Sequence, residues 1–583
     1  MPGRYQEQPS NLFPVVSLRL FSALKEKLKE GYSLSDFKSD LMSGIVVAMV
    51  AIPLGMALAI ASGVAPQYGL YTVIIGGGVV ALLGGSRFQV TGPTAAFVVI
   101  LAPIAQKFGF PGLLVAGMIA GFMLMLMGLA RMGRLIQFIP YPVTTGFTSG
   151  IAIVIATLQV KDFFGLHVDE MPERYLEKVL VLFRARSSVS LIEFGIGIST
   201  LLFLVFWPRI NKKIPAPLVA LGVASIIAAI IKSRFPGLEI ATIGNRFTFD
   251  IDGTVGHGIP QALPHLNLPW NYLGDDGKTF HLSWEMIESL VPSAFAIAML
   301  GAIESLLSAV VADGMAQTKH DPDGELLALG IGNVLCPFFG GIPATGAIAR
   351  TATNIRFGAK SPLSAVFHAI FTILVILLFA PYVSYLPMAA LAALLVLVAY
   401  NMSERKHFLH ILRVAPRGDV IVLLICFSLT VFFDMVVGVS IGIVLAALLF
   451  MQRMAKVTDA QKLVTHSHLG TQREIPHDIV VYEIAGPLFF GAAEKAAETM
   501  SDITDNIKSV IFVMSGVPVM DITGLVAFES AIKKLATGGK RKICLVGLKS
   551  QPAELIGKSG LIAGRRNIAI CHSMDEALRF SKA

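Results

Sequence analysis

Long apolar stretches alternate with short polar connections over most of the chain. Runs of about twenty mostly apolar residues recur from Leu41 to Met451, and each is long enough to cross the hydrocarbon core of a membrane. The pattern predicts about fourteen membrane elements, some of them too short to cross alone. Their predicted bounds are Leu41–Ser62, Tyr68–Leu83, Thr94–Lys107, Gly112–Ala130, Val143–Val160, Leu191–Phe206, Ala216–Ile231, Trp284–Val311, Glu325–Phe339, Gly346–Arg356, Leu363–Ala380, Leu386–Tyr400, Val420–Phe433 and Val436–Met451.

Two of these elements begin with stretches that interrupt the helical pattern. Residues 89–94 read Gln-Val-Thr-Gly-Pro-Thr, and residues 340–346 read Gly-Gly-Ile-Pro-Ala-Thr-Gly. Lipid cannot satisfy the backbone of such stretches, so they must be buried in protein or line a cavity. Paired interruptions are typical of transporters built from inverted repeats, and they predict repeats over residues 41–232 and 284–451. The alternative is a pair of proline kinks in ordinary helices.

The pattern changes after the last membrane element. Residues 471–583 alternate strand-like and helical runs, which predicts a small water-soluble α/β domain. We therefore expect a cytoplasmic N-terminal segment (1–40), a transmembrane transport domain (41–455) and this soluble domain (471–583). The predicted strands of the soluble domain are Ile479–Ile484, Ser509–Met514 and Ile543–Val546, and its predicted helices are Ala492–Met500 and Leu525–Leu535.

Composition supports a membrane protein. Of 583 residues, 54% are hydrophobic and 15% are charged, whereas soluble globular proteins carry roughly 25% charged residues. The net charge of +8 does not indicate a nucleic-acid partner, because the basic residues are spread over short connections instead of forming one patch. Such cations are typical of cytoplasmic connections, and they predict a multi-pass membrane protein with both termini in the cytoplasm.

The sequence contains no pattern typical of an enzyme or a metalloprotein. Its four cysteines lack metal-ligand spacing and are interpreted as buried thiols in a reducing compartment. A nucleotide-binding loop and a nucleophile constellation are also absent from the sequence. We therefore expect neither an enzyme nor a resident cofactor, and only a coupling ion, H⁺ or Na⁺.

Several motifs resemble those of a known family. Residues 65–71 (Ala-Pro-Gln-Tyr-Gly-Leu-Tyr), 84–87 (Gly-Gly-Ser-Arg), 91–94 (Thr-Gly-Pro-Thr) and 401–404 (Asn-Met-Ser-Glu) resemble the signature of the SulP anion transporters, the bacterial relatives of the SLC26 proteins. The resemblance covers nearly the whole chain. It implies fourteen transmembrane segments in two inverted seven-helix repeats, divided into a core and a gate domain. It also implies a C-terminal STAS domain, a homodimer and a place in the bacterial inner membrane.

Two further runs look most like one branch of that family. Residues 52–59 (Ile-Pro-Leu-Gly-Met-Ala-Leu-Ala) and 301–307 (Gly-Ala-Ile-Glu-Ser-Leu-Leu) are similar to the DauA-type C4-dicarboxylate transporters. Many relatives carry an acid or an amide after the proline of the first span, where this chain has Leu54. That departure removes one candidate proton-binding group.

The two interrupted stretches predict the anion site. The short helices after Thr94 and Thr345 are expected to point their N-termini at each other, with free N–H groups and about half a positive charge at each end. Both threonines can add hydroxyl donors. By resemblance, Arg350 matches a basic position beside the anion site, and the alternatives are an intracellular anchor or a structural ion pair. Small residues that allow a ligand close to the backbone are Gly92, Ala95, Ala96, Gly346 and Ala347.

Glu304 is the candidate group for ion coupling. It is the only acid deep within the predicted span Trp284–Val311, and Ser308 lies one turn away on the same face. In some relatives an acid and a hydroxyl at matching positions bind sodium. Alternatively, Glu304 carries a proton, because burial favours the protonated form of a carboxylate, or it makes an ordinary helix-to-helix hydrogen bond. His368, in another apolar span, is interpreted as a core histidine with satisfied hydrogen bonds.

The soluble domain has one candidate regulatory motif. Met520-Asp521-Ile522-Thr523 follows a predicted strand and opens a helix. It resembles the STAS loop in which a Ser or Thr is phosphorylated in anti-sigma-factor antagonists, and Thr523 falls on that position. The alternative, which we favour, is an Asp or Thr that caps the helix without modification. The resemblance also implies a cytoplasmic protein partner for this domain.

The predicted function is secondary active transport of a small anion. The leading expectation is proton-coupled uptake of C4-dicarboxylates (succinate, fumarate or aspartate) by alternating access. A second hypothesis changes the cargo to bicarbonate or sulfate, with sodium bound at Glu304 and Ser308. An anion channel and a membrane receptor that signals through the STAS domain are the remaining alternatives.

Overall fold

The computed structural model consists of two compact units. It describes residues 20–583 except for 135–138, 169–170, 173, 212–213, 236, 252–253, 273–279, 281, 434, 458, 464–475, 490–505, 537–540, 563–566 and 583. The first unit comprises Met1–Ile443 and the second Val444–Ala583. Each is described by itself below.

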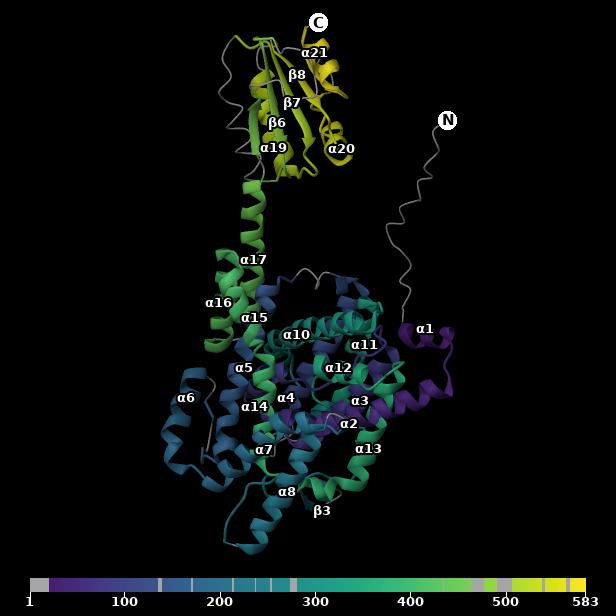
Figure 1. The fold of residues 1–583 in the computed structure, drawn as a ribbon, viewed down its shortest axis with the longest axis vertical. Helices are drawn as coiled ribbons and strands as arrows, with labels where there is room; N and C mark the ends of the chain where they lie inside the picture. Colours follow the sequence, from purple (N-terminus) through teal and green to yellow (C-terminus); the bar gives the residue numbers. More distant parts are fainter. Residues whose placement is uncertain are drawn as a thin grey trace. The chain divides into compact units, whose positions relative to one another are not determined.

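The first unit is a bundle of apolar helices (Figure 1). Within the described residues, ten helices are long and apolar enough to cross a membrane. Shorter apolar helices fall in other predicted elements. The bounds are α1 Ser22–Glu30, α2 Leu34–Ala61, α3 Pro66–Leu83, α4 Ala95–Leu129, α5 Tyr141–Phe164, α6 Tyr175–Arg184, α7 Leu191–Ile210, α8 Ala216–Arg234, α9 Ile243–Arg246, α10 Trp284–Ala316, α11 Pro322–Leu335, α12 Ile348–Arg356, α13 Leu363–Val383, α14 Met388–Met402, α15 Arg405–Val414, α16 Arg417–Phe432 and α17 Met435–Val457.

The helices of this unit pack as two groups. In the core group, α2 packs on α3 and α13, while α4 packs on α10 and α11, and α12 lies against α10 and α2. In the gate group, α5 packs on α14 and α16, and α7 packs on α8 and α14. Helices α7 and α8 leave large apolar side chains such as Leu202, Phe206 and Ile226 exposed. Exposed apolar surface on membrane-length helices is suited to contact with lipid.

Helix α4 contains the break that the sequence predicts between two elements. Gly109 has φ 66° and ψ −179°, which is not helical. Residues with a side chain rarely adopt a positive φ, so glycine permits the break at low cost. The break falls between the predicted elements Thr94–Lys107 and Gly112–Ala130. Both elements are therefore found, joined through a kink.

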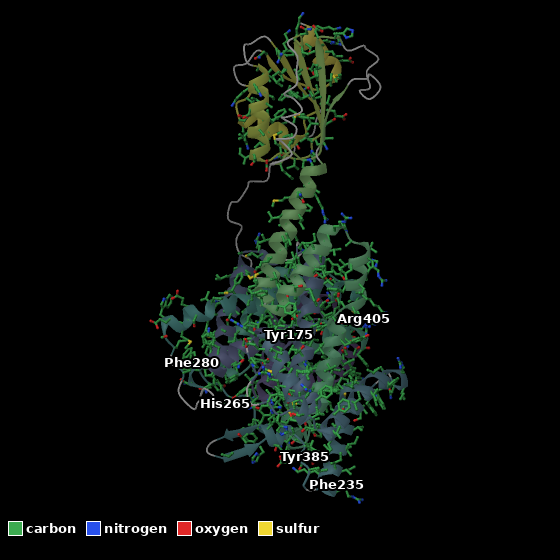
Figure 2. The ribbon with its side chains drawn as sticks, turned by 90° about the vertical axis from the view of Figure 1, so that its left-hand side faces the viewer. Tyr175, Phe235, His265, Phe280, Tyr385 and Arg405 are labelled. Carbon is green, nitrogen blue, oxygen red and sulfur yellow. The ribbon has the colours of Figure 1, made fainter. Side chains whose placement is uncertain are left out.

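The segment between α13 and α14 joins the core group to the gate group. Backbone hydrogen bonds attach this segment to the loop that follows α8. The N–H of Gly244 donates to the Ser384 carbonyl at 2.8 Å, and the N–H of Met388 donates to the Ala241 carbonyl at 2.8 Å. In Figure 2, Tyr385 of that segment and Phe235, which follows α8, are labelled at the same end of the first unit, and Arg405, after α14, is labelled farther from that end.

The second unit contains a five-stranded sheet in the order β5-β6-β7-β8-β9. The edge strand β5 is antiparallel to β6, and the other pairs are parallel. Helices α19 and α20 pack on one face of the sheet, and α21 packs on the other. The bounds are β5 Asp459–Leu463, β6 Ile479–Ala485, β7 Ser509–Gly516, α19 Ile522–Ala536, β8 Lys542–Val546, α20 Ser550–Lys558, β9 Ile568–Cys571 and α21 Met574–Lys582.

The α/β prediction for this unit is confirmed. Strands β6, β7 and β8 and helix α19 coincide with predicted elements. The predicted helix Ala492–Met500 lies outside the described residues. Strands β5 and β9 are additional, and Cys571 of β9 lies with its Sγ 3.2 Å from Sγ of Cys544 on β8. Burial raises the pKa of both thiols.

Candidate functional site

The two interrupted stretches meet in the core group. Residues Thr91–Gly92 form strand β1, and Thr345–Gly346 form strand β4. The two strands pair antiparallel, with Thr91 opposite Gly346 and Gly92 opposite Thr345. Helix α4 begins three residues after β1, and α12 begins two residues after β4. The two helices therefore start beside the same strand pair, and neither stretch is a kink within a continuous helix.

Both helix ends lack a side-chain cap. Thr94 precedes α4 in an extended conformation but makes no capping hydrogen bond, and Ala347, which precedes α12, has no side-chain acceptor. Among the described residues, no acceptor is found for the first N–H groups of either helix, Ala95–Phe97 in α4 and Ile348–Arg350 in α12. Uncapped N–H groups and the helix dipole attract a negative charge.

Arg350 brings a full positive charge to these ends. The residue is only 3% exposed, and its Nη2 donates to the carbonyl of Pro93, immediately before α4. Its Nη1 has no hydrogen-bond partner among the described residues. A buried guanidinium with a free donor requires an acceptor. Arg350 of the second repeat therefore reaches the helix start of the first repeat with one donor available to a ligand.

Glu304 of α10 lies beside the same helix end. Its Oε2 accepts a hydrogen bond of 2.8 Å from the Thr94 hydroxyl, and Arg350 lies within electrostatic range of the carboxylate. The site thus contains one fixed cation and one group that can carry or lose a negative charge. This contact also explains why Thr94 does not cap α4.

Other predicted site residues are engaged with the protein itself. The Thr345 hydroxyl donates to the Gly301 carbonyl at 2.8 Å, so the expected hydroxyl donor to an anion is already used. The N–H of Ala347 donates to the Val90 carbonyl at 2.9 Å. Ser308 donates to the Thr351 hydroxyl at 3.1 Å, whereas Glu304 contacts Thr94. The described contacts therefore do not join Glu304 and Ser308 as a pair.

The glycines of β1 and β4 leave no room for a side chain. A Cβ at Gly92 would lie 2.5 Å from Nη1 of Arg350, and a Cβ at Gly346 would collide with Nε2 of Gln89. The small residues Ala95 and Ala96 are also buried, at the start of α4. These positions allow the protein's own polar groups to approach the backbone closely, and close approach of a ligand stays a prediction.

A buried polar network that the sequence analysis missed supports β1. Nε2 of Gln89 donates to Oε1 of Glu325 at 2.8 Å and to Oγ of Ser305 at 2.6 Å. Oε2 of Glu325 accepts from the N–H groups of Gly85 and Ser86 at 2.9 and 3.0 Å. Glu325 stands at the beginning of a predicted element, where an acid usually complements the helix dipole. The sequence pattern therefore gives no indication that Glu325 accepts hydrogen bonds from Gly85, Ser86 and Gln89.

The regulatory motif of the second unit has the geometry of a helix cap. Oδ1 of Asp521 accepts a hydrogen bond of 2.6 Å from the N–H of Gly524, in the first turn of α19. Thr523 is exposed on the same turn. Asp521 thus has the geometry of a helix cap, and modification of Thr523 stays the alternative that the sequence leaves open.

Two family models match the chain. The model of the sulfate permease family matches residues 37–426, and that of the STAS domain matches residues 471–577. The putative sulfate transporter YvdB of Bacillus subtilis is 41% identical over 91% of this chain and 95% of its own length. The bicarbonate transporter BicA of Picosynechococcus is 27% identical over 93% of this chain and 94% of its own length.

Solved structures show the same fold. The murine Slc26a9 anion transporter superposes with a TM-score of 0.83 at 18% identity, over 99% of this chain and 97% of that chain. The transmembrane domain of a cyanobacterial BicA superposes with a TM-score of 0.59 at 27% identity, over 71% of this chain and 98% of that chain. The chain is accordingly a polytopic helical membrane protein of the SLC26 fold with a C-terminal α/β STAS domain.

Proposed function

The chain belongs to the sulfate permease family, the SulP and SLC26 anion transporters, and we propose that it carries sulfate together with a proton. The observation that supports this cargo most directly is the buried Arg350 with a free Nη1 between two uncapped helix ends. The proton is assigned to Glu304, which shares the site through Thr94.

Charge balance favours a divalent anion when Glu304 is protonated. Each helix N-terminus contributes roughly half a positive charge, and Arg350 contributes one, so the site offers about two positive charges. Sulfate carries two negative charges and matches that sum. Protonation of Glu304 also removes a carboxylate that competes with the cargo for Arg350. Proton and sulfate therefore bind in a mutually favourable way.

Bicarbonate is the second candidate. With Glu304 ionised, the same groups offer about one net positive charge, which matches a monovalent anion. The similarity to bicarbonate transporters over nearly the whole chain favours this alternative.

The C4-dicarboxylate cargo and the DauA-type resemblance gain no support. The similar proteins reported above carry the names of sulfate and bicarbonate transporters. A C4-dicarboxylate also places its two charges at opposite ends of a carbon chain, whereas one buried guanidinium, that of Arg350, supplies the fixed positive charge here. Succinate therefore serves as a comparison in the experiment below.

Transport by alternating access fits the two helix groups. The site belongs entirely to the core group, since β1, β4, α4, α10 and α12 supply it. Movement of the core group against the gate group would present it to each side of the bacterial inner membrane in turn. The homodimer, the cytoplasmic termini and a protein partner for the STAS domain accompany this proposal as predictions.

Flux measurements in proteoliposomes test the cargo. Full-length protein is reconstituted, and uptake of labelled sulfate, bicarbonate and succinate is followed with and without an inward proton gradient, and separately with a sodium gradient. We expect saturable sulfate uptake that the proton gradient accelerates. Sodium-driven bicarbonate uptake without sulfate uptake would favour the second candidate, and flux that does not saturate would indicate a channel.

A further inference from the structure

His368 on α13 is a fully buried polar residue that the proposed anion site leaves unused. It is 0% exposed, and neither Nδ1 nor Nε2 makes a hydrogen bond of normal geometry within the described residues, although the Ala365 backbone lies close to the ring. The expectation of a core histidine is thus half met, because the ring is buried but not satisfied. A neutral imidazole has one donor and one acceptor nitrogen, and leaving such groups unpaired inside a protein costs free energy.

The neighbouring polar residues on the same face of α13 are satisfied. Ser364 and Thr372 lie one turn before and one turn after His368, and both are 0% exposed. Ser364 donates to the Ser361 carbonyl at 3.0 Å and accepts from Nδ2 of Asn354 at 2.8 Å. Thr372 donates to the backbone carbonyl of His368 at 2.9 Å. The imidazole ring is therefore the unsatisfied part of an otherwise paired polar stripe.

The ring lies next to the first strand of the anion site. A Cβ at Gly77 of α3 would lie 4.0 Å from Cε1 of His368 and 3.0 Å from the carbonyl oxygen of Thr91. Thr91 is 1% exposed, and its hydroxyl also has no partner among the residues that the structure describes. The edge of the His368 ring on α13 and the Thr91 carbonyl of β1 thus both adjoin the bare surface of Gly77.

We propose that a buried water molecule lies between His368 and Thr91 and fixes the position of β1 in the anion site. Buried waters make two to four hydrogen bonds to polar groups that are otherwise unpaired. A ring nitrogen and an oxygen of Thr91 supply such partners. Thr91 is followed by Gly92, which contacts Arg350, so a displacement of β1 changes the surroundings of the guanidinium.

His368 acts here as a neutral positioning residue. Arg350 is a cation within electrostatic range of the ring, and a second positive charge beside it would be repelled. The hydrogen-bonding capacity of the neutral ring is what the site requires. A side chain with one donor and one acceptor but no charge should therefore replace it.

A cryo-EM map of the full-length protein in lipid nanodiscs tests the water directly. We expect ordered density within hydrogen-bonding distance of one His368 nitrogen and one Thr91 oxygen. The proposal would be overturned by a map that lacks this density and in which both ring nitrogens bond directly to protein groups, such as the nearby Ala365 carbonyl. This measurement does not depend on the cargo, so it succeeds or fails independently of the proposed function.

Variants test the positioning role, which rests on the proposed function. His368→Leu removes both polar atoms, and Gly77→Ala places a methyl group against Thr91. Each should raise the KM for sulfate about threefold to tenfold, as expected for the loss of one hydrogen-bonded contact. His368→Gln should restore the wild-type KM. The matched control is Gly78→Ala, whose Cβ would make only an ordinary contact of 3.6 Å with Ala369.

The pH profile of sulfate uptake separates positioning from proton transfer. We expect His368→Gln to keep the wild-type profile. A lost or shifted profile would assign a proton to the ring and overturn the neutral role. Equal KM values for Gly77→Ala and Gly78→Ala would likewise overturn the proposal, because the space beside Thr91 would then have no effect on the site.

Discussion

The hydroxyl of Thr94 donates to Oε2 of Glu304 at 2.8 Å, and this bond connects the start of α4 directly to α10. A change in the charge of Glu304 therefore alters the electrostatic potential at the uncapped N-terminus of α4 without any movement of a helix. Coupling between a proton and an anion requires this kind of proximity, because the energy of interaction between two charges falls with distance.

Glu304→Gln should abolish the acceleration of sulfate uptake by external acid. The amide keeps the volume of the carboxyl group and its contact with Thr94 but has no charge, so the site resembles its protonated form at every pH. Uptake into proteoliposomes at acidic and at neutral external pH measures the effect. Glu288→Gln, an exposed position on the same helix, is the control, and an unchanged pH profile in Glu304→Gln would contradict the assignment.

Arg350→Lys should raise the KM for sulfate about tenfold to a hundredfold, because hydrogen bonds to charged groups contribute about 1.5–3 kcal/mol. A lysine ammonium cannot reproduce the two-pronged geometry by which the guanidinium holds the Pro93 carbonyl and keeps Nη1 free. Initial rates over a range of sulfate concentrations give the KM. Arg356→Lys, an exposed residue at the end of α12, should behave as wild type.

Gly92→Ala should prevent sulfate from stabilising the protein against heat. The added Cβ would lie 2.5 Å from Nη1 of Arg350 and would displace the guanidinium from the helix ends. Thermal denaturation with and without sulfate measures the shift. Gly222→Ala on α8 is the control, because its Cβ would meet no atom within 4 Å. A normal sulfate shift in Gly92→Ala would show that the guanidinium tolerates the methyl group.

Glu325→Ala should lower the stability of the protein by about 2–5 kcal/mol, because it leaves several buried donors without an acceptor. The donors are the N–H groups of Gly85 and Ser86 and the amide of Gln89. Glu325→Gln retains one acceptor oxygen and should cost less. Thermal denaturation ranks the variants, and Glu285→Ala, at an exposed position, is the control. Equal midpoints for Glu325→Ala, Glu325→Gln and Glu285→Ala would argue against the network.

Asp521→Ala should destabilise the first turn of α19 by about 0.5–2 kcal/mol, the usual effect of removing an N-cap acceptor. Thr523→Ala removes an exposed hydroxyl and should leave the turn unchanged. Hydrogen exchange of the α19 amides in the full-length protein measures both. Faster exchange in Thr523→Ala than in Asp521→Ala would show that Thr523, and not Asp521, caps the helix.

The Gly and Pro interruptions carried most of the structural information in the sequence. Because Gly92-Pro93 and Pro343 cannot continue a membrane helix, the place of the half-helices followed from residue type alone. The break at Gly109 followed in the same way from two apolar runs that were separated by a short gap. Helix α17 exceeds its predicted end because Arg453 and Lys456 continue a helix that no longer needs apolar residues.

Side-chain partners were harder to predict because they depend on contacts between distant segments. The sequence predicts a Thr345 hydroxyl that binds the anion, but this hydroxyl donates to Gly301, and no local pattern indicates that Glu325 supports Gln89. In both cases the partner lies on another helix, and no local spacing reveals it. The preference for one anion is equally hard to predict from the sequence, because the donors of the proposed site come from separate segments.

The pairing of β1 with β4 has a consequence for attempts to re-engineer the protein. Thr91–Gly92 and Thr345–Gly346 come from different repeats but share one set of backbone hydrogen bonds. A substitution that reshapes one strand necessarily alters the register available to the other. Libraries aimed at a new anion preference should therefore randomise both strands together, since a variant that fails alone can succeed once its opposite residue has changed with it.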